Sequence, residues 1–324
     1  MKELRYVRSI TEALREEMIR DKTVCILGED VGAGGGAFSA TRGLLEEFGP
    51  DRVRDAPISE SSIIGVALGM ASTGLRPIVE IMFMDFLSLC MDPIVNGVAK
   101  WKFMFGGQYT APLVIRTPAG AANNAGPNHS QSLEAWFCHV PGIKVVMPST
   151  IYDLKGLLKS SIRDDDPVIF IEHKHLYAAK GEIPEEEFLV PLCQAEIKRE
   201  GSDVTVVATA QMVLEAMKAA DELAADGISV EIIDPRTISP LDMKTILDSV
   251  KKTSRLVVAH EAIRTCGLGA EIAARVAEEA FDYLDAPVKR VGAAFSPLPF
   301  AIPLEKACLP WADDIVRAVK EVTA

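Results

Sequence analysis

The sequence predicts an α/β protein of two domains, each built on a mainly parallel sheet flanked by helices. The chain has 324 residues, of which 48% are hydrophobic, enough to form two separate cores. Short apolar segments alternate with amphipathic ones along most of its length. The alternation stops around Pro184, in the acidic stretch Glu185 to Glu187. We therefore expect a first domain at 1–180, a linker at 181–195 and a second domain at 196–324.

The first domain is expected to open with a helix. Ser9 to Glu12 match a capping box, and Ile10, Leu14 and Met18 then recur at helical spacing. Apolar runs rich in β-branched residues predict strands, and the amphipathic segments between them predict helices. The strands are expected at 24–28, 53–59, 77–83, 111–116, 144–147 and 167–172, with further helices at 62–73, 86–104, 130–139 and 150–163.

The second domain repeats the same alternation after the linker. Its strands are expected at 204–209, 229–233, 255–260 and 288–292. Its helices are expected at 211–226, 240–252, 268–281 and 303–322.

Composition excludes several classes of protein. The formal net charge of −12 argues against binding to nucleic acid or to an anionic membrane. Neither a signal peptide nor a membrane span is predicted, because charged residues interrupt every long apolar stretch. The six cysteines lack CxxC spacing and lie mostly in apolar contexts, so we expect reduced thiols, no metal cluster and a cytoplasmic location.

Glu60 is the most informative residue. It lies where an apolar strand ends and a mainly hydrophobic helix begins, and residues 63–71 offer it no cation. An unpaired buried carboxylate is costly, so a ligand is one candidate partner. The alternative is a structural role at the helix N-terminus, where Ser59 or Ser61 could also serve as the cap.

Three loops are further candidates for a site. His129 lies in a long polar loop, Asn123 to Ser132, after a predicted strand, and histidine is the residue type best suited to proton transfer near neutral pH. Gly32 to Ala37 fits the dinucleotide pattern G-x-G-x-x-G/A, which would indicate an NAD-dependent dehydrogenase, although Glu29 and Asp30 would oppose a pyrophosphate. Asp164 to Asp166 could bind a hard cation or form a solvated turn.

Several motifs occur together in a fixed order. They are Gly28–Gly32, Pro57–Glu60, Gly74–Pro77, His129–Gln131, Pro141–Pro148 and Arg163–Val168. With these motifs the whole chain resembles the beta subunit of the thiamine-diphosphate-dependent first component of 2-oxo acid dehydrogenase complexes. Residues 103–107 and 169–174 are most similar to the acetoin dehydrogenase branch.

The resemblance implies a pyrimidine-binding domain of the transketolase type followed by a transketolase C-terminal domain. It implies that Glu60 meets the pyrimidine ring nitrogen of thiamine diphosphate and activates the cofactor, with Met82 and Phe86 lining the ring pocket. It also implies that His129 serves acyl transfer to a lipoyl group. A monovalent cation such as K⁺, found in some relatives, would be held by main-chain oxygens of Leu113, Ser161, Ile162, Asp164 and Asp166.

The sequence lacks the Gly-Asp-Gly motif that holds the divalent ion and the diphosphate in thiamine diphosphate enzymes. In the family this motif, with its Mg²⁺, lies on an alpha subunit. The resemblance therefore implies an alpha2beta2 heterotetramer docked on a lipoyl acyltransferase core. A noncatalytic interaction subunit remains an alternative, and Leu89 and Asn128 depart from the glutamines of some relatives, which leaves the substrate open among acetoin, pyruvate and branched-chain 2-oxo acids.

Overall fold

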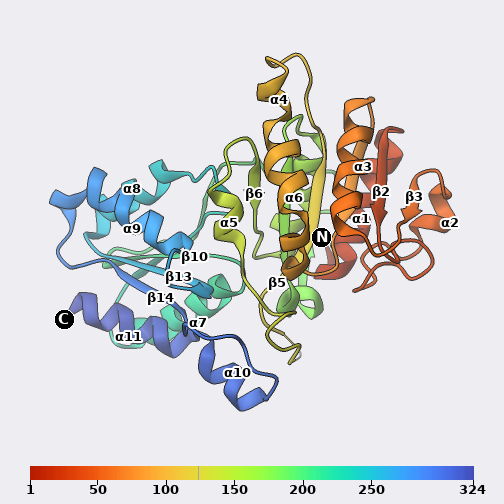
Figure 1. Cartoon of the computed structure of the whole chain (residues 1–324). Helices are drawn as coiled ribbons and strands as arrows, with labels where there is room; N and C mark the ends of the chain where they lie inside the picture. Colours follow the sequence, from red (N-terminus) through yellow and green to blue (C-terminus); the bar gives the residue numbers. More distant parts are fainter. Residues whose placement is uncertain (123) are drawn as a thin grey trace. The chain divides into compact units, whose positions relative to one another are not determined.

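The computed structural model describes residues 1–122 and 124–324, so Asn123, the first residue of the expected polar loop, lies outside the described residues. The chain divides into two compact units (Figure 1). Unit 1 comprises 1–119 and 136–192, and unit 2 comprises 120–135 and 193–324. The short segment 120–135, which carries His129, is therefore grouped with unit 2.

Unit 1 contains a sheet whose strands run in the order β6-β7-β5-β4-β2-β3, every neighbouring pair being parallel. The central strands are buried along their whole length, which explains their continuous apolar sequences. The strands are β2 (Val24–Gly28), β3 (Val53–Asp55), β4 (Arg76–Glu80), β5 (Val114–Ala119), β6 (Lys144–Val146) and β7 (Val168–His173).

A separate antiparallel pair, β1 (Lys2–Arg5) and β8 (Lys180–Ile183), joins the two ends of unit 1. The pattern of apolar residues did not predict these strands, because both alternate in burial and are rich in charged residues.

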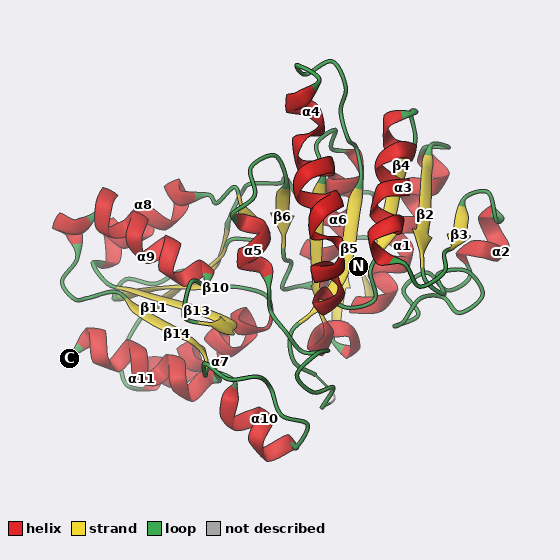
Figure 2. Ribbon diagram, in the orientation of Figure 1, coloured by secondary structure: helices red, strands yellow, loops and turns green. Residues whose placement is uncertain are grey.

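Helices cover the sheet of unit 1 (Figure 2). Helix α1 (Tyr6–Arg20) packs against α6 (Ile151–Arg163), and α3 (Glu60–Ser72) packs against β4. The expected capping box does not form, because α1 begins earlier, at Tyr6, and the Ser9 hydroxyl donates to the Tyr6 carbonyl inside the helix. Unit 1 also contains α2 (Leu44–Phe48) and the 3₁₀ turn η4 (Lys174–Ala178), while α5 (Glu134–Cys138) has residues in both units.

The helix expected at 86–104 is irregular. It consists of the 3₁₀ segments η1 (Met84–Cys90) and η3 (Val98–Lys100), the π-helical turn η2 (Pro93–Gly97) and α4 (Trp101–Met104). Pro93 lacks an amide hydrogen and Gly97 is a weak helix former, so a regular helix is disfavoured here.

Unit 2 contains a sheet in the order β14-β13-β10-β11-β9, in which only β9 runs antiparallel to its neighbour. Its strands are β9 (Glu196–Arg199), β10 (Val204–Ala208), β11 (Val230–Asp234), β13 (Leu256–Ile263) and β14 (Lys289–Ala293), with β12 (Thr237–Ser239) following β11 in the chain. Its helices are α7 (Gln211–Ala225), α8 (Met243–Thr253), α9 (Leu268–Glu279), the 3₁₀ turn η5 (Phe281–Tyr283), α10 (Ile302–Cys308) and α11 (Ala312–Thr323).

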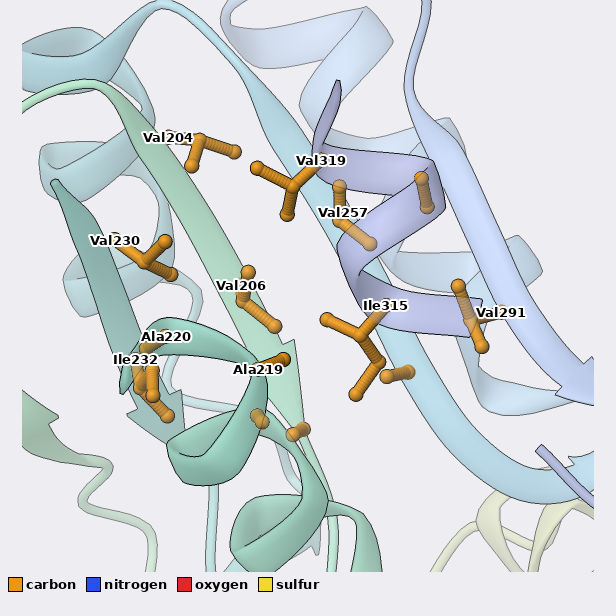
Figure 3. Close-up of a cluster of buried hydrophobic side chains, with 14 of the residues drawn as sticks. Val204, Val206, Ala219, Ala220, Val230, Ile232, Val257, Val291, Ile315 and Val319 are labelled. Atoms are coloured by element: carbon orange, nitrogen blue, oxygen red, sulfur yellow. The ribbon is translucent and has the colours of Figure 1, made fainter. Parts of the chain in front are cut away.

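The core of unit 2 lies between this sheet and the helices α7 and α11. Figure 3 shows Val206 of β10 and Val257 of β13 close to Ile315 and Val319 of α11. The single helix expected at 303–322 is two helices, because Pro310 favours extended backbone at Leu309, whose ψ is 150°.

Candidate functional site

Glu60, the glycine loop, Met82 and Phe86 all follow the carboxyl ends of strands in the unit 1 sheet. Gly28 at the end of β2 is paired with Glu80 at the end of β4, and Glu80 is paired with Arg116 of β5. The loops that follow β2 and β4 therefore begin side by side at the same edge of the sheet. Crevices at this edge of an open parallel sheet are the usual place for ligands.

Glu60 is the first residue of α3 and is only 8% exposed. It accepts no hydrogen bond and forms no ion pair within residues 1–122 and 124–324. Ser59, one of the two serines expected to cap this helix, is the N-cap residue but makes no side-chain cap and donates its hydroxyl to the Pro57 carbonyl. The positive end of the helix dipole favours a carboxylate at this position.

Acidic character is concentrated around Glu60. Burial raises the pKa of Glu29, and the nearby Glu60 carboxylate raises it further. Burial, with a smaller contribution from the same two carboxylates, raises the pKa of the Cys90 thiol to about 12. Cys90 is thus held as a neutral thiol and is unsuited to act as a nucleophile or metal ligand. This environment favours a ligand group that can share a proton with Glu60.

Met82 and Phe86 follow β4 and are both half-buried. The Phe86 ring packs edge-on against Phe83 with the ring centroids 5.6 Å apart. Phe83 in turn packs against Phe38, at 5.7 Å between centroids. These side chains form an apolar and aromatic surface after β4, of the kind that accepts a flat ring.

The glycine loop does not form a dinucleotide site. The Gly32 amide donates to the Asp55 carboxylate at 2.7 Å, and the Ala37 amide donates to Glu80 at 3.3 Å. Both amides are therefore already directed at carboxylates, which would repel a pyrophosphate. The next helix, α2, begins only at Leu44, so the loop does not lead directly into a helix N-terminus as the dinucleotide pattern requires.

A charged cluster that sequence reasoning missed lies beside this loop. Arg116 is 1% exposed and is held between Glu80 and Glu172, at 2.8 Å and 2.7 Å. The signal was present, because these charged residues lie in buried, mainly apolar strands: Glu80 ends β4, Arg116 lies in the middle of β5 and Glu172 lies near the end of β7. Such residues must be paired, and neighbouring parallel strands are the natural place for their partners.

His129 lies in unit 2, in the loop before α5, and is half-buried. Its Nδ1 atom is 3.3 Å from Oδ1 of Asn128. The loop is closely packed at Gly126, whose φ is +79° and where a Cβ atom would come within 2.3 Å of the Phe300 ring. Pro127 and Gln131 of this loop line a pocket of about 300 Å³ together with Glu261 and Phe295.

The oxygens expected to hold a monovalent cation lie around the C-terminal end of α6. Arg76 Nη1 donates to the carbonyls of Ile162 and Asp164, at 3.1 and 2.9 Å. Of the other expected ligands, the Ser161 carbonyl accepts the Asp164 amide at 3.3 Å and the Leu113 carbonyl accepts the amide of Val168 at 3.0 Å.

The carboxylates of the acidic triplet are matched by cations. Asp164 and Asp166 accept from Lys144 at 2.8 and 3.1 Å, and Asp165 pairs with Arg76. No cluster of His, Cys, Asp and Glu in the described chain is arranged to hold a metal ion. All six cysteines, which belong to described segments, are free thiols. Within the same segments, none of the helices has the length and apolar character needed to cross a bilayer.

The two mainly parallel sheets and the buried glutamate at the start of α3 define an α/β chain of the transketolase type. The family profile of the transketolase pyrimidine-binding domain matches residues 2–180, and that of the transketolase C-terminal domain matches residues 193–315. A solved chain described as a split gene transketolase, inactive beta4 tetramer, has the same fold, with a TM-score of 0.81 and 24% identity, covering 98% of this chain and 97% of its own.

Curated relatives narrow the family further. The pyruvate dehydrogenase E1 component subunit beta of Rickettsia felis is 49% identical, covering 97% of this chain and 96% of its own length. The acetoin:2,6-dichlorophenolindophenol oxidoreductase subunit beta of Bacillus subtilis is 46% identical, covering 97% of this chain and 95% of its own length. The chain belongs to this family of beta subunits of pyruvate and acetoin dehydrogenase first components.

Proposed function

We propose that this chain is the beta subunit of a thiamine-diphosphate-dependent oxidoreductase that cleaves a carbon–carbon bond in a 2-oxo acid or acetoin. The observation that carries the proposal is Glu60, which is buried at the start of α3 without a partner among the described residues. The relatives named for pyruvate and acetoin support the substrate class.

The residues present fit the pyrimidine ring of thiamine diphosphate. A carboxyl group in an acidic, buried setting can share a proton with a ring nitrogen, and this requires no free cation nearby. The half-buried side chains of Met82 and Phe86 offer apolar packing for the faces of the ring. When bound, the cofactor supplies a thiazolium carbon that attacks the substrate carbonyl and accepts the electrons of the broken bond.

Glu60 holds and moves one proton at the ring nitrogen in this proposal. A surface carboxylate would be a poor choice, because water would compete for the hydrogen bond and screen it. Burial and the nearby Glu60 carboxylate both raise the pKa of Glu29, which shows that two negative charges side by side are disfavoured here. The rest of unit 1 serves to hold this carboxyl group at the carboxyl edge of the sheet.

The alpha subunit would contribute the second half of the site. The chain contains no Gly-Asp-Gly motif, so we assign the diphosphate and its Mg²⁺ to a partner. Named beta-subunit relatives support the existence of such a partner. We propose an alpha2beta2 heterotetramer that operates in the cytoplasm and delivers acyl groups to a lipoyl acyltransferase core.

We assign His129 to that acyl transfer. Its imidazole is only half-buried and belongs to a loop, so an incoming group can approach it. Asn128, whose Oδ1 atom lies 3.3 Å from Nδ1, can fix the tautomer of the ring.

We also propose a bound K⁺ ion at the C-terminal end of α6. It would share the carbonyls of Ile162 and Asp164 with Arg76, since each carbonyl oxygen has two lone pairs. Thermal unfolding in KCl and in NaCl of equal concentration tests this proposal. The midpoint temperature of unfolding should be several degrees higher in KCl, and equal midpoints would contradict a K⁺ site.

The central experiment is Glu60→Gln in the complex reconstituted with the alpha subunit. Glutamine preserves volume and packing but cannot exchange a proton with the pyrimidine nitrogen. If this proton transfer contributes roughly two to four decades in rate, the variant loses on the order of 3–5 kcal/mol of transition-state stabilisation. Exchange of the thiazolium proton, followed by NMR after rapid quenching, should slow accordingly.

Assembly with alpha and the unfolding midpoint should stay at wild-type values in this variant, which separates chemistry from folding. Wild-type proton exchange and turnover in Glu60→Gln would support the alternative of a noncatalytic interaction subunit. Tight NADH binding to the loop 32–37 would instead support the alternative of an NAD-dependent dehydrogenase.

A further inference from the structure

The buried charged cluster in unit 1 consists of Glu80, Arg116 and Glu172, with the hydroxyl of Tyr177. Arg116 donates through Nε and Nη2 to both oxygens of Glu172, at 2.7 and 2.9 Å, and through Nη1 to Glu80 at 2.8 Å. Tyr177 donates its hydroxyl to Glu172 at 2.7 Å. None of the three charged side chains is more than 5% exposed.

Such a cluster is expensive unless every member is satisfied, because ions lose their hydration on burial. Burial raises the pKa of Glu80, and Glu172 adds to that effect while Arg116 opposes it. Burial would lower the pKa of Arg116, but the two carboxylates reverse this and raise it. The cluster is therefore a rigid unit in which each charge depends on the others.

One oxygen of Glu80 is directed away from Arg116 and towards the glycine loop. Oε1 accepts the amide of Ala37 at 3.3 Å, while Oε2 accepts from Arg116. The loop approaches so closely that a Cβ atom on Gly36 would lie 2.4 Å from Oε1, and the φ of Gly36 is +78°. Position 36 therefore requires glycine for two reasons: its φ is positive, and the Glu80 carboxylate leaves no space for a side chain.

Phe38, which follows Ala37 in this loop, connects the cluster to the aromatic surface after β4. Its ring is 4.9 Å from the Tyr177 ring and 5.7 Å from the Phe83 ring, between centroids. Phe83 contacts Phe86, and Lys174 Nζ lies 5.2 Å from the centre of the Phe83 ring. The cluster consequently holds residues 36–38 from two sides, through Glu80 and through Tyr177.

We infer that Glu80 is a positioning residue: anchored by Arg116, it fixes the loop 36–38 so that Phe38 and Phe83 hold Phe86 against the cofactor ring. The part that concerns the cofactor rests on the proposed function. The part that concerns the loop does not, since it follows from contacts within unit 1. The glycine loop thus helps to position the aromatic surface after β4. This role replaces the dinucleotide binding that its sequence pattern suggested.

Two glycine variants test the contact with a matched control. Gly36→Ala pushes a methyl group into the Glu80 carboxylate, whereas Gly43→Ala introduces the same methyl group at a similar φ, +88°, with no atom within 4 Å. Hydrogen exchange of the Ala37 amide in the full chain should be at least about tenfold faster in Gly36→Ala. It should stay within about twofold of wild type in Gly43→Ala.

Glu80→Gln tests the carboxylate itself. Glutamine has one acceptor oxygen and one amide donor group, so it cannot accept from Ala37 and Arg116 through separate atoms. Ala37 exchange should again be about tenfold faster. In the complex with alpha, the dissociation constant of thiamine diphosphate should rise about tenfold while kcat at saturating cofactor stays within about twofold.

Glu16→Gln controls for lost stability, because it removes ion pairs of unit 1 that lie on α1, away from the loop. It should change the unfolding midpoint but neither Ala37 exchange nor cofactor affinity. The inference is wrong if Gly36→Ala and Gly43→Ala behave alike, or if Glu80→Gln keeps wild-type exchange and affinity. A wild-type complex that fails to bind thiamine diphosphate would instead refute the proposed function and leave the exchange results standing.

Discussion

Gly269 packs directly against the imidazole of His260, so closely that a Cβ atom at position 269 would lie 2.9 Å from Nε2. Gly267 and Gly292 approach the same ring, and the histidine is completely buried in β13. Nδ1 is 3.0 Å from the Ala262 carbonyl. Three glycines thus approach this ring, and its Nε2 atom is buried with no hydrogen-bond partner in the described part of the chain.

His260 should make unit 2 sensitive to acid. Burial lowers the pKa of His260 from 6.5 to about 4, and the positive charge of Arg290 adds to the effect. Between these pH values the unfolded chain binds a proton that the folded chain excludes, so stability falls as pH drops from 6.5 and the loss is complete near 4. At 1.36 kcal/mol for each pKa unit, the loss is about 3 kcal/mol.

Urea unfolding between pH 4 and 8 checks this prediction. Wild type should lose stability over that range more steeply than His260→Asn, which lacks the titrating ring. Parallel curves for the two proteins would show that the histidine does not carry the acid sensitivity.

Cofactor binding should require both subunits. Calorimetry should find thiamine diphosphate binding to the isolated chain at least about tenfold weaker than to the complex with alpha, and no turnover by the chain alone. The reason is the missing diphosphate motif, since the pyrimidine contacts are only part of the binding energy. Tight Mg²⁺-dependent binding by the isolated chain would contradict the divided site.

His129→Ala should affect acyl transfer selectively. Reduction of lipoyl groups should fall by roughly two to four decades, as expected for loss of a positioned proton donor. The partial reaction with an artificial electron acceptor should fall by less than about tenfold. His139→Ala, which removes an exposed histidine, serves as the control, and wild-type lipoyl reduction in His129→Ala would remove His129 from the mechanism.

The ion pairs between α1 and α6 should stabilise unit 1. Lys159 is 1% exposed, and its ammonium group lies 2.8 Å from Glu16 and 3.5 Å from Glu187. Burial alone would raise the pKa of Glu16, but hydrogen bonds from Lys155 and Lys159 outweigh it and lower the pKa. Lys159→Met should reduce the free energy of unfolding by about 1–3 kcal/mol, because Glu16 keeps only one partner.

Lys244→Met is the matched control for that variant, since the pair of Lys244 with Asp248 is exposed on α8. Urea unfolding should detect no change there. An equal loss of unfolding free energy in the two variants would mean that burial of the ion pairs between α1 and α6 does not increase their contribution to stability.

Local patterns predicted the regular elements well, and failed where distant contacts decide. The apolar run at 24–28 became β2 as expected, because a strand buried on both faces needs a continuous apolar sequence. The charged strand β1 escaped detection, since its partner β8 lies at the other end of unit 1. The start of α1 was misplaced because the Tyr6 amide donates to Ala179, a contact that no local motif signals.

The sequence by itself determined the α/β class, the order of strands and helices, and Glu60 as a carboxylate without a cation nearby in the chain. Those features depend on local periodicity and on the cost of burying charge, both of which can be read residue by residue. Only the tertiary structure revealed that Glu80, Arg116 and Glu172 form one cluster, and that Gly36 packs against Glu80. Residues 80, 116 and 172 are far apart along the chain, and parallel pairing of β4, β5 and β7 brings them together, so their interdependence arises from packing and not from any sequence pattern.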